Sequence, residues 1–142
     1  MTEPLRNRGD YGYFSEQHTR WEDNDIFQHV NNVAYYSFFD TAINEFLINR
    51  GQFDPFTTDI VGFIVHSHCD FFAPLRHPSQ FQVGVRTNHL GNSSVRYGVA
   101  VFPAAADMAI AVGEMTHVFV SRDNETATPI PEAIRAALAA NQ

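Results

Sequence analysis

Residues 30–51 read VNNVAYYSFFDTAINEFLINRG, and this stretch decides the fold. Apolar residues recur in it at intervals of three and four, as on one face of an α-helix: Val33, Tyr36, Phe39, Ile43 and Phe46. A second apolar row lies on the other side: Tyr35, Phe38, Ala42 and Leu47. Asn31 or Asn32 can cap the start, and Gly51 suits the position just past the end. We therefore predict a helix over about residues 31–50, roughly 30 Å long, and a helix that is apolar nearly all round is usually buried.

Strand-like runs flank this helix. They cover residues 13–20, where the alternation is weak, and then 60–72, 81–90, 95–102 and 108–122. Leu90-Gly91-Asn92-Ser93 is a turn signal that joins two of these runs as a hairpin, and Pro131-Glu132 opens a short closing helix to about residue 140. Short connections favour an antiparallel sheet, and one long buried helix must pack on a face of it. The sequence thus predicts an α+β domain.

The composition fits a single domain of 142 residues, with residues 1–12 flexible and no repeat or linker. The net charge is −7 and no basic run occurs, which argues against binding to nucleic acid or to an anionic membrane. Cys69 is the only cysteine, so no intrachain disulfide can form. The chain shows neither an apolar leader nor an apolar run of about 20 residues, and we expect a cytoplasmic protein.

The loop before the long helix holds three carboxylates: Glu22, Asp23 and Asp25. One interpretation is structural, because acidic side chains near a helix N-terminus favour the helix dipole by up to about 1 kcal/mol. The other is catalytic. The first N–H groups of a helix are unsatisfied donors that can stabilise the oxyanion of an acyl transfer. A carboxylate beside them can attack the carbonyl or take a proton from water.

Two other chemistries deserve comparison. In His66-Ser67-His68-Cys69-Asp70, residues 66, 68 and 70 share one face of a strand and could hold zinc, but no second ligand cluster with metal spacing occurs. Cys69 points to the opposite face and suits a small buried position better than a nucleophile. No G-x-S-x-G, phosphate-binding loop or dinucleotide motif is present. We expect no metal and no cofactor.

The segment RWEDNDIFQHVNNVAYYSFFDTA, residues 20–42, resembles the 4-hydroxybenzoyl-CoA thioesterase-like family of hotdog proteins, whose pattern is approximately D-x-D-x-x-G-H-V-N-N-x-x-Y. Asp23 and Asp25 match the two aspartates, and Asp25 matches the catalytic one. The remaining matches are His29, Val30, Asn31, Asn32 and Tyr35, which would position the substrate or form the oxyanion hole. Later segments resemble the family in the right order, over roughly residues 13–140. Gln28 departs from the pattern, because it replaces a glycine.

The resemblance implies a hotdog fold: an antiparallel sheet of five or six strands wrapped around the long helix, with a short C-terminal helix. It also implies an acyl-CoA thioesterase that forms a homodimer or a dimer of dimers, with Asp25 as nucleophile or general base. The hairpin at Asn92, Ser93 and Ser94 lacks the basic cluster that some members use to bind coenzyme A. Arg76 would supply that charge, with Arg86 and Arg96 as alternatives.

Two alternatives remain open at this level. A hotdog hydratase or dehydratase would use a histidine beside an acid, and His29 lies near Asp25 in the sequence. A non-catalytic acyl-CoA-binding protein would keep the pocket and release no thiol. The acyl group, and the choice between coenzyme A and an acyl-carrier protein, are not set by these motifs.

Overall fold

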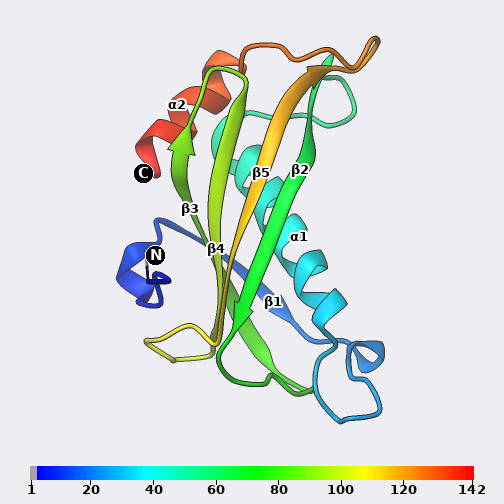
Figure 1. Cartoon of the computed structure of the whole chain (residues 1–142), viewed down its shortest axis with the longest axis vertical. Helices are drawn as coiled ribbons and strands as arrows, with labels where there is room; N and C mark the ends of the chain where they lie inside the picture. The colour runs from blue at the N-terminus through cyan, green and yellow to red at the C-terminus, as the bar shows by residue number, and fades with distance from the viewer. Residues whose placement is uncertain (1–2) are drawn as a thin grey trace.

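The computed structural model describes residues 3–142, which form one antiparallel sheet and two α-helices (Figure 1). The strands are β1 (Tyr13–His18), β2 (Ile60–Phe71), β3 (Gln80–Leu90), β4 (Ser94–Pro103) and β5 (Ala111–Ser121). The helices are α1 (Asn32–Gly51) and α2 (Glu132–Ala140), with 3-10 turns at Arg8–Asp10 and Trp21–Asp23. All neighbouring strands are antiparallel, in the order β1-β3-β4-β5-β2. The predicted elements, their order and the hotdog architecture are confirmed.

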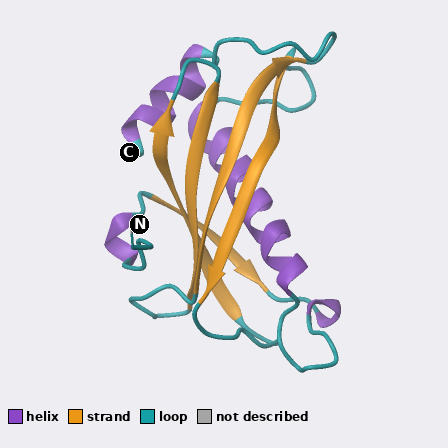
Figure 2. Ribbon diagram, viewed as in Figure 1, coloured by secondary structure: helices purple, strands orange, loops and turns teal. Residues whose placement is uncertain are grey.

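The sheet curves around α1, and α2 lies near β3 at one end (Figures 1 and 2). Alternate side chains of β3, β4 and β5 face α1 and are fully or almost fully buried, because the strand period of two sends every second residue inward. The helix contributes the rest of this core: Ala34, Tyr35, Phe38, Phe39, Ala42, Ile43, Phe46 and Leu47. None of the helices in residues 3–142 is long and apolar enough to cross a membrane.

The expectation that α1 is buried holds for most of its apolar residues, with Val33 and Ile48 as exposed exceptions. Val33 is 74% exposed, and Tyr36 is only partly buried, while their neighbours Ala34 and Tyr35 are buried. Polar residues such as Asp40 and Thr41 also face outward. The helix therefore has one solvent-facing stripe, and Val33 leaves an apolar side chain exposed at its first turn.

The C-terminus of α1 differs from its predicted form. Gly51 is the last helical residue, and Gln52 takes the left-handed conformation (φ 55°) that ends the helix. A Cβ on Gly51 would lie 3.2 Å from Cγ1 of Ile134. Glycine therefore eases the close approach of α2 to α1 here, because a Cβ would require Ile134 to shift slightly.

The edge strand β1 is tied to α1 by Glu45. One carboxylate oxygen accepts from the Tyr13 hydroxyl at 2.8 Å and the other from the Ser15 hydroxyl at 2.7 Å. Asn49, one turn further along α1, donates to the Tyr13 oxygen at 2.9 Å. A charged acceptor shared between two hydroxyls holds the helix in register with the edge of the sheet.

Glu45→Ala should lower the free energy of unfolding by about 2 kcal/mol, because it leaves the buried Ser15 and Tyr13 hydroxyls without their charged acceptor. Urea denaturation followed by circular dichroism measures this change. Asp40→Ala, on the exposed stripe of the same helix, is the control and should change stability by about 0.5 kcal/mol or less. Equal effects of the two substitutions would contradict a specific role of Glu45.

Candidate active site

The loop before α1 is held by Asp23, which is 2% exposed. Its carboxylate accepts from the Arg20 backbone N–H at 2.7 Å and from the Arg20 guanidinium at 2.9 Å. Its backbone carbonyl accepts from the Asn31 N–H at 2.8 Å. Asp23 therefore uses both its side chain and its backbone to fix the loop against the start of α1.

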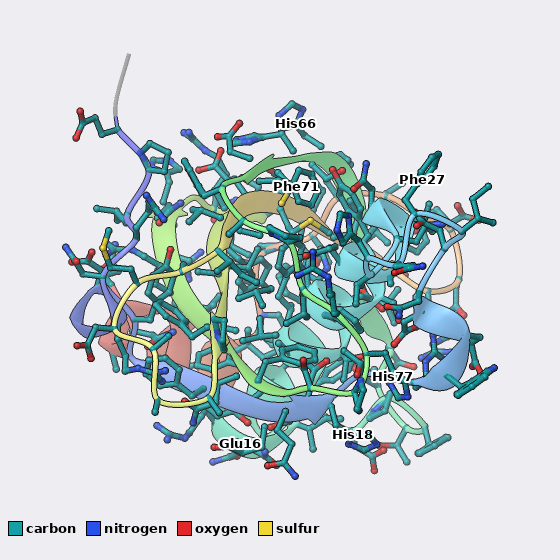
Figure 3. The ribbon with its side chains drawn as sticks, turned by 90° about the horizontal axis from the view of Figure 1, so that it is seen from below. Glu16, His18, Phe27, His66, Phe71 and His77 are labelled. Carbon is teal, nitrogen blue, oxygen red and sulfur yellow. The ribbon has the colours of Figure 1, made fainter. Side chains whose placement is uncertain are left out.

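Asp25 has a different environment. It is half-buried, and its carboxylate oxygen Oδ1 accepts the Phe27 N–H at 2.9 Å. Its backbone N–H donates to the His29 carbonyl at 2.9 Å. Among residues 3–142 no arginine or histidine forms an ion pair with it. Within residues 3–142, no hydrogen-bond partner is found for the other carboxylate oxygen, Oδ2. Phe27, two residues on, lies at the periphery of the molecule (Figure 3).

A cavity of about 310 Å³ lies beside the start of α1. His29, Val30, Asn32 and Tyr35 line one side of it. The other side is made by the end of β2 and the segment after it: Phe71, Phe72, Ala73 and Pro74. Asp25 is not among the lining residues within one chain, although its backbone is bonded to His29.

The β2 side of this cavity carries no motif that marks it in the sequence. Phe71 and Phe72 lie at the end of β2, just before Pro74. This proline, which marks the end of a strand, was the only local feature of the sequence that pointed to these two residues. The ring of Phe71 stands edge-on to that of Tyr35, with centroids 5.0 Å apart. Burial raises the pKa of the Tyr35 phenol, so that Tyr35 stays protonated at neutral pH and contributes an aromatic wall.

The backbone amides at the helix start are not equally available. Val30 N–H donates to the Leu75 carbonyl at 2.7 Å, and Asn31 N–H donates to Asp23. Val33 N–H is capped by the Asn31 side chain at 3.0 Å. Within residues 3–142, no acceptor is found for the N–H of Asn32, which lines the cavity. Of the predicted backbone donors Val30, Asn31 and Asn32, only Asn32 therefore keeps an N–H without an acceptor in this part of the chain.

His29 contacts a residue far away in the sequence. The Arg76 guanidinium lies 3.0 Å from Nε2 of the His29 ring. Of the residues expected to bind coenzyme A, Arg76 does not line the cavity but contacts His29, which does. Asn92, Ser93 and Ser94 lie at the other end of the sheet, where the hairpin of β3 and β4 packs beside α2 (Figure 1). Within one chain, these three residues cannot share a binding site with Arg76.

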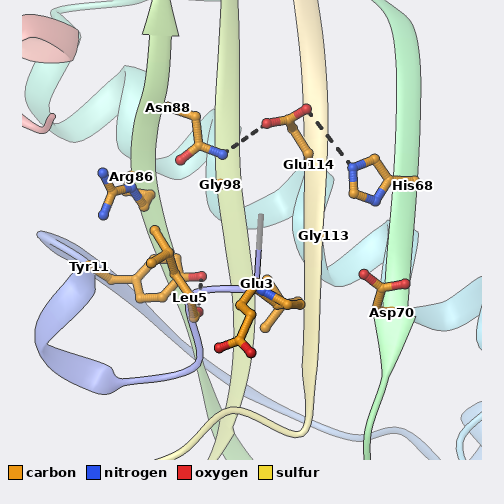
Figure 4. A pocket seen from close by; sticks show the side chains of 12 residues that line it. Glu3, Leu5, Tyr11, His68, Asp70, Arg86, Asn88, Gly98, Gly113 and Glu114 are labelled. Carbon is orange, nitrogen blue, oxygen red and sulfur yellow. Dashed lines mark hydrogen bonds and ion pairs between the residues drawn. The ribbon is translucent and has the colours of Figure 1, made fainter. Parts of the chain in front are cut away.

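The histidines of β2 lie on the outer face of the sheet, opposite α1. His68 is 3.9 Å from Glu114, which also accepts from Asn88 at 3.0 Å (Figure 4). No group of three or more metal-ligating side chains occurs within residues 3–142. Cys69 faces the core instead, and burial raises the pKa of its thiol to about 12, so it is not a thiolate nucleophile at neutral pH.

Comparisons with known proteins point to one class. The model of the thioesterase-like superfamily matches residues 19–138. The PA5185 protein from Pseudomonas aeruginosa is 47% identical, and its crystal structure aligns over 97% of both chains with a TM-score of 0.94. The PA2801 protein of the same species, described as a candidate thioesterase, is 25% identical over 87% of this chain and 95% of its own (TM-score 0.81).

A 1,4-dihydroxy-2-naphthoyl-CoA thioesterase from Synechocystis is 17% identical, with 89% of this chain and 95% of its own covered and a TM-score of 0.79. At that identity the likeness concerns the fold. No curated protein sequence matches the chain.

Gln28 has a left-handed backbone (φ 67°), which accounts for the glycine that the family pattern has at this position. Gln28→Gly should raise the free energy of unfolding by up to about 1 kcal/mol. The relieved strain, about 1–2 kcal/mol, exceeds the extra chain entropy of glycine, about 0.5–1 kcal/mol.

Gln28→Val should instead lower that free energy by about 1 kcal/mol or more, because a β-branched residue tolerates this conformation poorly. Chemical denaturation of both variants tests the pair. The strain argument fails if glycine and valine leave the protein equally stable.

Proposed function

The chain belongs to the thioesterase-like superfamily, and we propose that it hydrolyses an acyl-CoA thioester at the cavity beside the start of α1, with Asp25 as its catalytic carboxylate. The observation that carries this proposal is a pairing. The Asp25 carboxylate, which has no ion pair within residues 3–142, and the Asn32 backbone N–H, for which no acceptor is found there, belong to one short loop and the helix that follows it.

The proposed chemistry follows from these two groups. The Asn32 N–H binds the thioester oxygen and stabilises the negative charge that develops on it. Asp25 then attacks the carbonyl carbon to form an anhydride that water cleaves, or it takes a proton from a water that attacks directly. In both routes the C–S bond breaks, coenzyme A leaves as a thiolate that is protonated to the thiol, and the acyl group leaves as a carboxylate.

Two features support the choice of an acyl group for the cavity. The rings of Tyr35, Phe71 and Phe72 supply an apolar side to its walls. The polar groups, from His29 and Asn32, come from the helix start. An apolar chamber with a few convergent polar groups at one end is the usual form of a small-molecule site.

We also propose that the enzyme is a homodimer joined through β2. This strand is an edge of the sheet, and it exposes apolar side chains: Phe63 42%, Ile64 40%, Val65 61% and Phe71 43%. An exposed apolar edge favours pairing with another strand. A second copy would cover the side of the cavity that Phe71 and Phe72 leave open. Whether two dimers pair further stays a prediction.

Asp25→Asn should reduce kcat for thioester hydrolysis by about 100- to 10,000-fold, because an amide neither attacks the carbonyl nor accepts a proton. Asparagine can still accept the Phe27 N–H, so the loop should keep its conformation. A thiol-release assay over a panel of acyl-CoA substrates measures the loss.

Asp54→Asn is a matched control, because Asp54 accepts the Phe56 N–H at 2.9 Å in the same kind of turn, away from the cavity. It should leave kcat unchanged. Wild-type turnover by Asp25→Asn would refute the assignment. Hydration of an enoyl thioester without thiol release would favour the hydratase instead, and tight binding without turnover would favour the binding protein.

Val65→Arg should convert the dimer to a monomer and lower activity, because it places a charge in the middle of the proposed interface. Size-exclusion chromatography with light scattering should give twice the 16.0 kDa chain mass for the wild type and the single mass for the variant. Thr41→Arg, on the exposed stripe of α1, should remain dimeric. A wild-type protein that elutes as a monomer would exclude this interface.

A further inference from the structure

The contact between Arg76 and His29 joins two segments that are 47 residues apart in the sequence. It does not stand alone. Leu75, next to Arg76, is 5% exposed, and its carbonyl accepts the N–H of Val30, next to His29. The two backbones are therefore held together by a buried side chain and a hydrogen bond, which brings the two longer side chains within reach of each other.

The direction of the hydrogen bond between Arg76 and His29 follows from the chemistry of the two side chains. A guanidinium has five N–H donors and no acceptor. Nε2 of His29 must therefore accept the hydrogen bond, which requires a neutral ring whose proton sits on Nδ1. Within residues 3–142, no partner is found for Nδ1, and the ring lines the cavity together with Asn32.

We propose that Arg76 is a positioning residue that fixes His29 as an Nδ1–H donor to the thioester oxygen, beside the Asn32 amide. This inference rests on the proposed function. It gives the oxyanion a side-chain donor in addition to the backbone donor. It also gives Arg76 a role other than binding the phosphates of coenzyme A.

The same contact bears on the choice of reaction. A hydratase or dehydratase needs a base that removes a proton from carbon or from water, and a neutral imidazole has one basic lone pair. In His29 that lone pair, on Nε2, already accepts from Arg76. His29 can therefore donate a hydrogen bond but has no free lone pair with which to abstract a proton, which suits hydrolysis driven by Asp25.

The first experiment reads the tautomer directly. Long-range proton–nitrogen NMR spectra of the ¹⁵N-labelled full chain at neutral pH should show His29 protonated on Nδ1, with His29→Gln identifying the signals by their loss. In Arg76→Ala the protonated Nδ1 form should no longer dominate. Arg76→Lys keeps a donor-only side chain and should largely restore it. A wild-type ring protonated on Nε2 would overturn the proposal.

The second experiment separates positioning from coenzyme A binding. Each enzyme is assayed with an acyl-CoA and with the matching acyl-N-acetylcysteamine thioester, which lacks the nucleotide. Arg76→Ala should lower kcat about 10- to 100-fold on both substrates, as expected for a displaced catalytic group. Its KM for acyl-CoA should stay within about twofold of the wild-type value. Arg50→Ala, which removes an exposed arginine from the other end of α1, should leave kcat unchanged.

A rise in KM confined to acyl-CoA would assign Arg76 to nucleotide binding and overturn the positioning role. Absence of thiol release by the wild type on every substrate would refute the proposed function, while the NMR measurement would still decide whether Arg76 sets the tautomer. Thermal melts of the Arg76 variants show that any loss of rate occurs in a folded protein, and Arg76→Lys supplies a second variant if alanine destabilises the loop.

Discussion

The candidate site depends on two backbone hydrogen bonds that hold the start of α1 from opposite sides. Asn31 N–H donates to Asp23 in the preceding loop, and Val30 N–H donates to Leu75 in the segment after β2. The preceding loop and the distant segment at Leu75 are thereby both fixed to one helix terminus. Because each of these bonds uses an N–H that a free helix end would offer to solvent, they also determine which amide stays available. Of the three amides from Val30 to Asn32, the Asn32 N–H is the one for which no acceptor is found within residues 3–142, and it is the backbone donor that we propose.

Asp23 and Asp25 are close in sequence but differ in their surroundings, and the roles that we assign to them differ accordingly. Asp23 is buried and hydrogen-bonded to Arg20, and removing the Arg20 side chain would leave this buried carboxylate without its guanidinium partner. Asp25, two residues later, has one hydrogen bond to its side chain and no ion pair within residues 3–142. A carboxylate that already serves the fold has little left for chemistry, whereas one whose position is set through its backbone keeps its side chain free. The same residue type supports the loop at one position and is available to react at the other.

Much of the fold could be predicted from the sequence, because helices and strands have characteristic spacings of apolar residues that can be recognised locally. The apolar spacing of residues 30–51, and the strand runs separated by turn residues, place each element within a few residues of its observed bounds. The details of the site could not be read in this way, since they depend on contacts across the fold. The bond between His29 and Arg76 and the occupied amide of Val30 each join residues more than 40 positions apart, and the Asn92 hairpin is placed by its packing beside α2. Gln28 is intermediate: the family pattern marks the position, but only the backbone angle explains the glycine.

The exposed end of β2 connects the proposed assembly with the proposed chemistry. Phe71 and Phe72 are 43% and 41% exposed, and both line the cavity beside the helix start. Complete burial of one such side chain is worth about 1.5–3 kcal/mol, so leaving two of them half in water is a cost that a partner could remove. An acyl group seated in the cavity would cover part of the same surface, and a second copy along β2 would cover the rest. If the seated acyl group also contacts the second copy, substrate binding and dimerisation favour each other, because each then supplies part of the surface that the other packs against.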